Sequence, residues 1–175
     1  PSGTEIICAL GHQDEIVGIS HECDFPLEIR HLPLCTKPRL NVHTSSLEID
    51  KSVKSLLHNA LSIYEIDEDI LKKLNPDLII TQSQCDVCAV SLADVELLLK
   101  SKIGLDPKIV SLQPKKLSDI WEDINLIAES LGVAKKGLDL SSKIKNNIDN
   151  LKTSPNLKSK PTVACIEWIN PLMFA

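Results

Sequence analysis

Two cysteines separated by two residues stand out in the segment TQSQCDVCAVS, residues 81–91, which follows an apolar run. The spacing Cys85-x-x-Cys88 lets two thiolates bind one metal ion, and thiolates combined with imidazole suit zinc, copper or iron. A second pair of such side chains, His21 and Cys23, occurs in the segment HECDFP, residues 21–26. The four side chains of His21, Cys23, Cys85 and Cys88 are therefore a candidate metal site, with zinc as one ion it would take.

The same cysteines fit two other interpretations. The chain has six cysteines, an even number that allows disulfides, and free thiols that shape a pocket are equally compatible with the spacing. A thioredoxin-like redox site is less favoured, because Ala89 and Val90 follow the motif and it does not open a helix directly after a strand. The spacing alone does not choose among a metal site, a disulfide and free thiols.

Alternating strands and helices must position these residues. Short apolar runs bounded by polar or turn residues predict strands over 15–20, 61–66, 77–82 and 108–113. Between them a helix ends at Gly11, another begins at Ser45, a short one begins at Asp67, and a fourth spans 91–102. The short connections predict βα units and a parallel sheet, which is an α/β lobe over residues 1–115.

The alternation of predicted strands and helices ends at Pro114. Apolar residues at helical spacing predict one helix over 117–131 and a second over about 134–152. The second helix would be roughly 28 Å long, about the width of a small domain. A polar linker and a strand over 162–168 follow. We expect residues 116–153 to be connecting helices, and residues 161–175 to be the start of a second, truncated lobe.

Composition excludes several classes of function. The chain is 43% hydrophobic and 3% aromatic with a formal charge of −5, so it lacks the basic face with stacking aromatics that nucleic-acid binding requires. No apolar run approaches the length of a membrane span, which excludes membrane insertion of this segment. The motifs GxGxxG, GxxxxGK[ST], GxSxG and HExxH are all absent, so no catalytic residue is assigned.

The predicted topology gathers the unusual residues at one edge. In an open parallel sheet, ligands bind beyond the carboxyl ends of the strands. The segments that follow the predicted strands are HECDFP, residues 65–67, SQCDVC, residues 114–116 and WINPLMF. Turn residues of ordinary type occupy the opposite ends. We therefore expect a ligand site on this edge of the sheet.

Several of these segments, taken in order, resemble one protein family. The succession of PSGTEIICALG, EIVGISHECDFP, NPDLIITQ, IVSLQP, a long helix and VACIEWINP resembles the helical-backbone (class III) substrate-binding proteins of ABC importers for cobalamin and ferric siderophores. The resemblance covers the whole chain. It implies two α/β lobes joined by one long helix, a ligand clamped between them, and no catalytic activity. It also implies one more strand ahead of the PSGTE segment, most of a second lobe beyond Pro171, and a periplasmic or extracytoplasmic location, lipid-anchored in some members.

The resemblance assigns roles to particular residues. Asp24, Phe25 and the proline after them match the family's D-(Y/F)-P motif on the rim of the cleft. Trp168 and Asn170-Pro171 match the entry to the opposite wall. Asp69 falls where the family carries an acidic residue that docks on arginines of the ABC permease, although a helix dipole also favours a carboxylate there. Together with the rule of strand ends, the predicted ligand-contact residues are His21, Glu22, Cys23, Asp24, Phe25, Tyr64, Glu65, Gln82, Cys85, Cys88, Glu167, Trp168, Asn170 and Pro171.

The ligand is where the chain departs from the family. Cobalamin binders carry an aromatic residue two positions before the Asp of D-(Y/F)-P, and here Glu22 stands there. Siderophore binders often use arginines, and none occurs in these loops. Because HECDFP and CDVC resemble a cobalamin-binding subgroup, a corrinoid is the first choice and a ferric or other metal chelate the second. The alternative hypothesis is a cytoplasmic metal-handling protein, or a metal-dependent enzyme, that uses the Cys/His cluster on the same fold.

Overall fold

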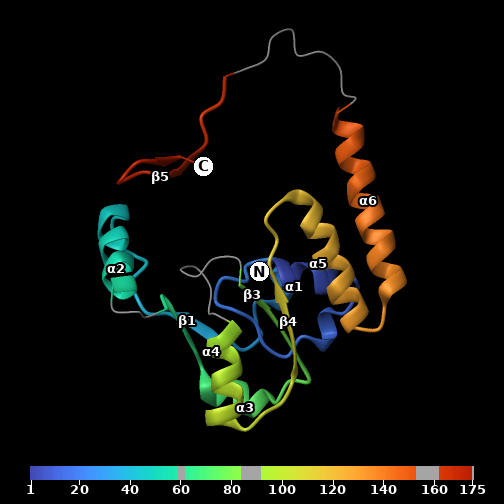
Figure 1. Cartoon of the computed structure of the whole chain (residues 1–175), viewed down its shortest axis with the longest axis horizontal. Coiled ribbons are helices and arrows are strands. Elements are labelled where there is room, and N and C mark those ends of the chain that lie inside the picture. The colour runs from blue at the N-terminus through green and yellow to red at the C-terminus, as the bar shows by residue number, and fades with distance from the viewer. Residues whose placement is uncertain (59–61, 84–91, 153–161, 175) are drawn as a thin grey trace.

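The computed structural model of this chain describes residues 1–58, 62–83, 92–152 and 162–174 (Figure 1). It is an α/β structure built around two parallel strands, β3 (Leu78–Gln82) and β4 (Lys108–Leu112), that pair in register from Leu78 with Lys108 to Gln82 with Leu112. Helices α1 (Ser2–Ala9) and α5 (Leu117–Ser130) lie on one side of these strands, and α3 (Glu68–Leu74) and α4 (Leu92–Leu97) lie on the other.

Alternation along the two strands explains this layering. Ile80, Val110 and Leu112 belong to a core with α1 and α5 that includes the fully buried Ile127. Ile79 and Ile109, one residue out of phase, pack on Leu71, Val95 and Leu99 of the opposite layer. Successive side chains of a strand point to opposite faces, so these apolar runs require cover on both sides. The predicted α/β class is confirmed.

The helices near the end of the described core match their predicted spans closely. Helix α5 is followed by α6 (Ala134–Lys152), with Gly132 between them at a φ of 73°, the left-handed backbone that favours glycine. At Gly137 the two helices approach so closely that a Cβ would lie 2.5 Å from the Cβ of Ala128. Glycine is therefore what lets α6 pack tightly against α5.

The remaining strands correct the sequence predictions. The predicted strand over 15–20 is reduced to a single bridge between Ile19 and Leu34, preceded by a 3-10 turn (Gln13–Glu15). The predicted strand over 61–66 is only β2 (Tyr64–Ile66), and it pairs antiparallel with an unforeseen strand, β1 (Thr36–Pro38). The expectation that it joins a parallel sheet was wrong. Its partner strand β1 precedes α2 (Ser46–His58) in the sequence, β2 follows that helix, and the two strands run antiparallel.

Two further segments differ from prediction in detail. The helix predicted over 91–102 is α4 followed by a π-helical turn (Leu98–Ile103), which ends at Gly104 with a φ of 72°. The strand predicted over 162–168 is β5 (Ile166–Trp168), which forms an antiparallel hairpin with β6 (Met173–Phe174). A second 3-10 turn (Leu27–Ile29) follows the HECDFP segment. The domain boundaries at 115, 153 and 161 stay predictions.

None of the helices in the described part of the chain has both the length and the apolar character that crossing a bilayer requires.

Candidate functional site

A polar cluster lies at the carboxyl ends of β3 and β4. The Ser83 and Ser111 hydroxyls are 2.7 Å apart, and the amide nitrogen Nε2 of Gln113 donates to Ser83 Oγ at 2.8 Å. The Ser83 backbone N–H donates to the carbonyl of Leu112 at 3.0 Å, which continues the strand pairing one residue beyond Gln82. Sequence reasoning missed Ser83, Ser111 and Gln113, although the rule of strand ends applied to each residue would have found them.

The CDVC motif follows this cluster directly but lies in the segment 84–91, outside the described residues. Cys85 and Cys88 are therefore not placed, and the metal site they would form with His21 and Cys23 stays a prediction. Within the described ranges, no three His, Cys, Asp or Glu side chains are arranged to hold a metal ion.

His21 is held in a hydrogen-bonded network between two segments of the chain. Thr36 Oγ1 donates to Ser20 Oγ at 3.0 Å, so it accepts from the His21 backbone N–H at 3.2 Å and from Nδ1 at 2.7 Å. The ring also meets Tyr64 edge to face, with centroids 4.9 Å apart. The other ring nitrogen, Nε2, is buried and lies 3.3 Å from a Glu22 carboxylate oxygen.

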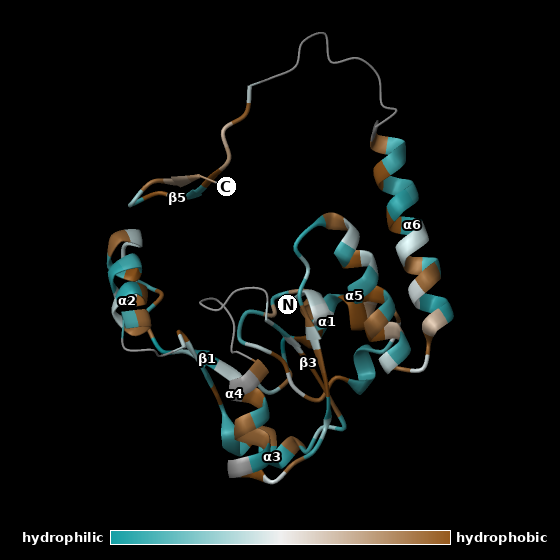
Figure 2. Ribbon diagram, viewed as in Figure 1, coloured by the Kyte–Doolittle hydropathy of each residue, from teal (hydrophilic) through white to brown (hydrophobic). Residues whose placement is uncertain are grey.

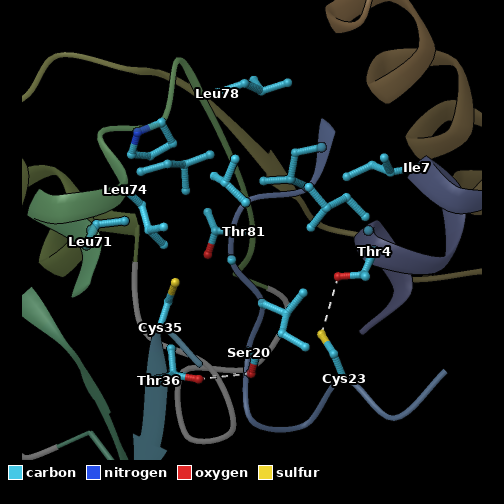
Figure 3. Close-up of a pocket in the computed structure, with 18 of the residues that line it drawn as sticks. Thr4, Ile7, Ser20, Cys23, Cys35, Thr36, Leu71, Leu74, Leu78 and Thr81 are labelled. Atoms are coloured by element: carbon cyan, nitrogen blue, oxygen red, sulfur yellow. Dashed lines mark hydrogen bonds between the residues drawn. The ribbon is translucent and has the colours of Figure 1, made fainter. Parts of the chain in front are cut away.

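Cys23 is placed as a core residue. It is buried among Ile19 and Ile29, and its Sγ lies 3.3 Å from Thr4 Oγ1 (Figure 3). The neighbouring thiol of Cys8 has its pKa raised by burial and then by the proximity of Cys23. His21 and Cys23 are close in sequence, but in the structure each has its own set of partners.

Tyr64 and Glu65 lie on β2 beside two basic residues that sequence reasoning missed. Glu65 pairs with Lys37 Nζ at 3.1 Å and with Arg39 at 3.4 Å. The Nε–H group of Arg39 donates to the Tyr64 carbonyl at 3.2 Å. Two cations share one carboxylate, so the group formed by Lys37, Arg39 and Glu65 carries a net positive charge. No arginine occurs in the strand-end loops themselves, and β1 is the element that brings Arg39 there.

The remaining predicted residues lie at the surface. Glu22 and Asp24 are exposed, and Phe25 is 60% exposed beside a groove lined by Ile29, Ile124 and Ile144. Asp69 is exposed in the first turn of α3, whose N-cap Asp67 accepts from the Ile70 N–H at 3.0 Å.

The four residues predicted for the opposite wall lie in the hairpin of β5 and β6. Glu167, Asn170 and Pro171 are exposed or half-buried there. The indole N–H of Trp168 donates to the carbonyls of Asn170 at 3.0 Å and Ser46 at 3.2 Å. The hairpin therefore contacts α2 in addition to following α6 along the chain.

A cavity of about 740 Å³ lies between residues 15–20 and β3 (Figure 3). Four predicted ligand-contact residues line it, namely Glu22, Cys23, Tyr64 and Gln82, together with Ser20, Thr36 and Thr81. Residues 15–20 and strand β3 both line it, and no backbone–backbone hydrogen bond between the described residues joins these two segments.

Comparison with known proteins gives structural but no sequence-level matches. No protein-family model matches the sequence, and no curated protein matches it either. The fold matches a periplasmic heme-binding protein from Roseiflexus sp. RS-1 with a TM-score of 0.63 and 20% identity, covering 95% of this chain and 52% of that one.

Two further solved structures also match the fold. A possible iron-binding periplasmic solute-binding protein from Staphylococcus epidermidis matches with a TM-score of 0.63 and 20% identity, covering 95% of this chain and 53% of that one. The periplasmic vitamin B12-binding protein of Vibrio cholerae matches with a TM-score of 0.57 and 19% identity, covering 87% and 48%. This chain spans about half the length of each of these three proteins. The chain therefore has the fold of one lobe of a bilobal periplasmic binding protein.

Proposed function

We propose that this chain is the first lobe, with the connecting helix, of a non-catalytic substrate-binding protein that delivers a metal chelate to an ABC importer. The observation that carries this proposal is the fold: proteins named for heme, vitamin B12 and iron share it over about half of their length. A corrinoid is the first choice of ligand, as the HECDFP and CDVC segments indicate, and a ferric chelate is the second. The location would be periplasmic or extracytoplasmic.

The rim residues support a large polar ligand. His21, Tyr64 and Thr36 form one connected surface through hydrogen bonds and ring contact, and Lys37 and Arg39 adjoin it with one net positive charge. Corrins and ferric chelates carry amide or carboxylate groups around a metal centre, and such groups pair with fixed donors and cations. The hydrophobic ring of Tyr64 would meet the apolar face of the ligand.

Delivery to the permease would use Asp69. This carboxylate is exposed on α3, where it is available to arginines of a partner. Its proposed role requires a second acidic residue on the other lobe, because a bilobal protein presents one docking surface on each lobe.

The test is a titration of the full-length protein with cobalamin, ferric siderophores, heme and zinc, followed by absorbance and calorimetry. The proposal expects saturable binding of at least one chelate at one site. It also expects that binding to survive in a Cys85→Ser/Cys88→Ser variant with at most a change in affinity. If no chelate binds, while zinc binds tightly and is lost in that variant, the proposal is wrong and the metal-handling alternative takes its place.

A further inference from the structure

Helix α2 is an amphipathic helix without a buried residue. Its apolar side chains Ile49, Val53 and Leu56 recur at helical spacing and are half-buried, and Leu47 and Leu57 are exposed. Apolar and polar residues alternate in bands along it (Figure 2). Helices of this length normally gain their stability by packing one face against another element. The first lobe alone does not supply that partner within the described residues.

The two chain segments at the base of α2 are paired with each other. The β1–β2 ladder brackets the helix in sequence and pairs Thr36 with Ile66 and Pro38 with Tyr64. The Arg39 N–H donates to the Ile63 carbonyl at 2.8 Å, and the Asp67 N–H donates to the Cys35 carbonyl at 2.9 Å. We call residues 36–66 the arm. Its base carries Tyr64 and Glu65, and its far part is α2.

The N-terminal end of α2 meets the β5–β6 hairpin (Figure 1). The Trp168 indole N–H is shared between the carbonyl of Asn170, within the hairpin, and the carbonyl of Ser46, in the first turn of α2. That first turn is itself fixed, because Glu48 accepts from the Ser45 hydroxyl at 2.9 Å and donates its N–H to the same hydroxyl at 3.4 Å. The Ser46 carbonyl, which accepts the hydrogen bond from Trp168, therefore has a defined position.

The hairpin brings apolar surface to this contact. Ile166, Ile169, Leu172 and Phe174 are each more than half exposed, so the hairpin, like α2, has apolar side chains with little cover. Two exposed apolar surfaces joined by a hydrogen bond at their edge gain free energy by closing on one another.

We propose that α2 is the docking surface of the first lobe for the β5–β6 hairpin of the second lobe, with the bond from Trp168 to the Ser46 carbonyl as its anchor. The lobes then have two connections, α6 and the arm. Because the arm begins and ends at the β1–β2 ladder, the position of the hairpin is coupled to Tyr64 and Glu65. The proposal rests on the bilobal fold and does not depend on the ligand.

Hydrogen–deuterium exchange of the full chain tests whether a change at Trp168 affects α2. Trp168→Phe removes the indole donor and keeps an aromatic ring, so amides of α2 should exchange about fivefold faster, as loss of one hydrogen bond predicts. The matched control is Trp121→Phe, because the Trp121 ring faces Lys145 Nζ at 5.5 Å on α6 and is not in the arm. Unchanged exchange in α2, or equal acceleration across residues 117–152, would overturn the proposal.

Tryptophan emission tests whether a change in α2 affects Trp168, since coupling between two sites is reciprocal. The chain has two tryptophans, so a Trp121→Phe background leaves Trp168 as the sole emitter. Ser45→Ala loosens the first turn of α2 and should shift the Trp168 emission to the red and raise its quenching by acrylamide. Ser52→Ala, which removes a hydroxyl bonded only within the helix at 2.9 Å, should leave both unchanged. Indifference of Trp168 to Ser45→Ala would contradict the anchor, and neither measurement involves a ligand, so the proposed function would stand.

Discussion

His21 Nδ1 lies 2.7 Å from Thr36 Oγ1, and this contact ties the loop after residue 20 to strand β1. The Thr36 hydroxyl also accepts from the His21 backbone N–H and donates to Ser20. One side chain therefore joins the HECDFP segment to the arm, and the two contacting residues are fifteen positions apart in the sequence.

Replacing Thr36 by valine tests this junction. Thr36→Val keeps the shape and removes the hydroxyl, so the partly buried donors of His21 lose their acceptor. We expect a loss of roughly 1–3 kcal/mol in the free energy of unfolding, measured by urea denaturation. Thr44→Val is the control, because its hydroxyl bonds to the Asn41 carbonyl at an exposed turn and should change stability little. Equal effects of the two substitutions would show that the junction contributes nothing specific.

The close approach of α5 and α6 predicts an unusual response at Gly137. Alanine at a helix interior is normally favourable by about 1 kcal/mol. Here its Cβ would lie 2.5 Å from the Cβ of Ala128, so Gly137→Ala should instead destabilise by roughly 1–2 kcal/mol.

A double-mutant cycle isolates that contact. Ala128→Gly makes room for the new methyl group, so the double variant should lose less stability than the sum of the two single variants. Thermal or urea unfolding of the four proteins measures the coupling. Strict additivity would mean that the helices separate freely and that Gly137 is not what sets their spacing.

Asp123 predicts a dependence of stability on pH. It is only 8% exposed, and burial, followed by the neighbouring carboxylates of Asp119 and Glu122, raises its pKa. A carboxyl group whose folded pKa is raised binds its proton more tightly in the folded state. Its contribution to stability is therefore present below the ordinary carboxyl pKa and is lost as pH rises through the folded pKa.

Asp123→Asn should accordingly stabilise the protein at neutral pH and have a smaller effect in acid. Urea denaturation across the acidic range, compared with the exposed Asp14→Asn control, measures the difference. The opposite trend, in which the advantage of asparagine grows as pH falls, would contradict the assignment.

The group formed by Lys37, Arg39 and Glu65 carries a net positive charge, which predicts a preference for anionic ligands. Lys37→Gln/Arg39→Gln leaves the Glu65 carboxylate without its two partners and reverses the local charge. We expect weaker binding of chelates that carry carboxylates, by about tenfold, and a reduced dependence of binding on salt, because exposed charges are screened. Lys135→Gln, at the exposed start of α6, should have no effect. A double variant that binds anionic and neutral chelates as the unmodified protein does would remove Lys37 and Arg39 from the site.

Local patterns in the sequence predicted part of this structure well. Strands β3 and β4, the N-cap at Asp67 and the helices α5 and α6 follow from apolar periodicity and from caps that act over a few residues. Such signals depend on neighbours in sequence, and tertiary contacts did not override them.

The arm could not be predicted in the same way. Strand β1 contains Pro38, which removes a backbone donor, and it has only three residues, too few for a visible alternation. Its partner β2 lies beyond α2, and the contact of Trp168 with Ser46 spans 122 residues. The basic pair of Lys37 and Arg39 was missed for this reason, since its position depends on that pairing.

Calorimetric titration of the full-length protein with cobalamin, with heme and with ferric siderophores tests the proposed binding of a metal chelate. We expect saturable binding of one of these ligands at one site, weakened about tenfold or more by Tyr64→Ala, because the aromatic ring contributes buried contact area. Absence of binding to all three, or binding that Tyr64→Ala leaves unchanged, would contradict the proposed function.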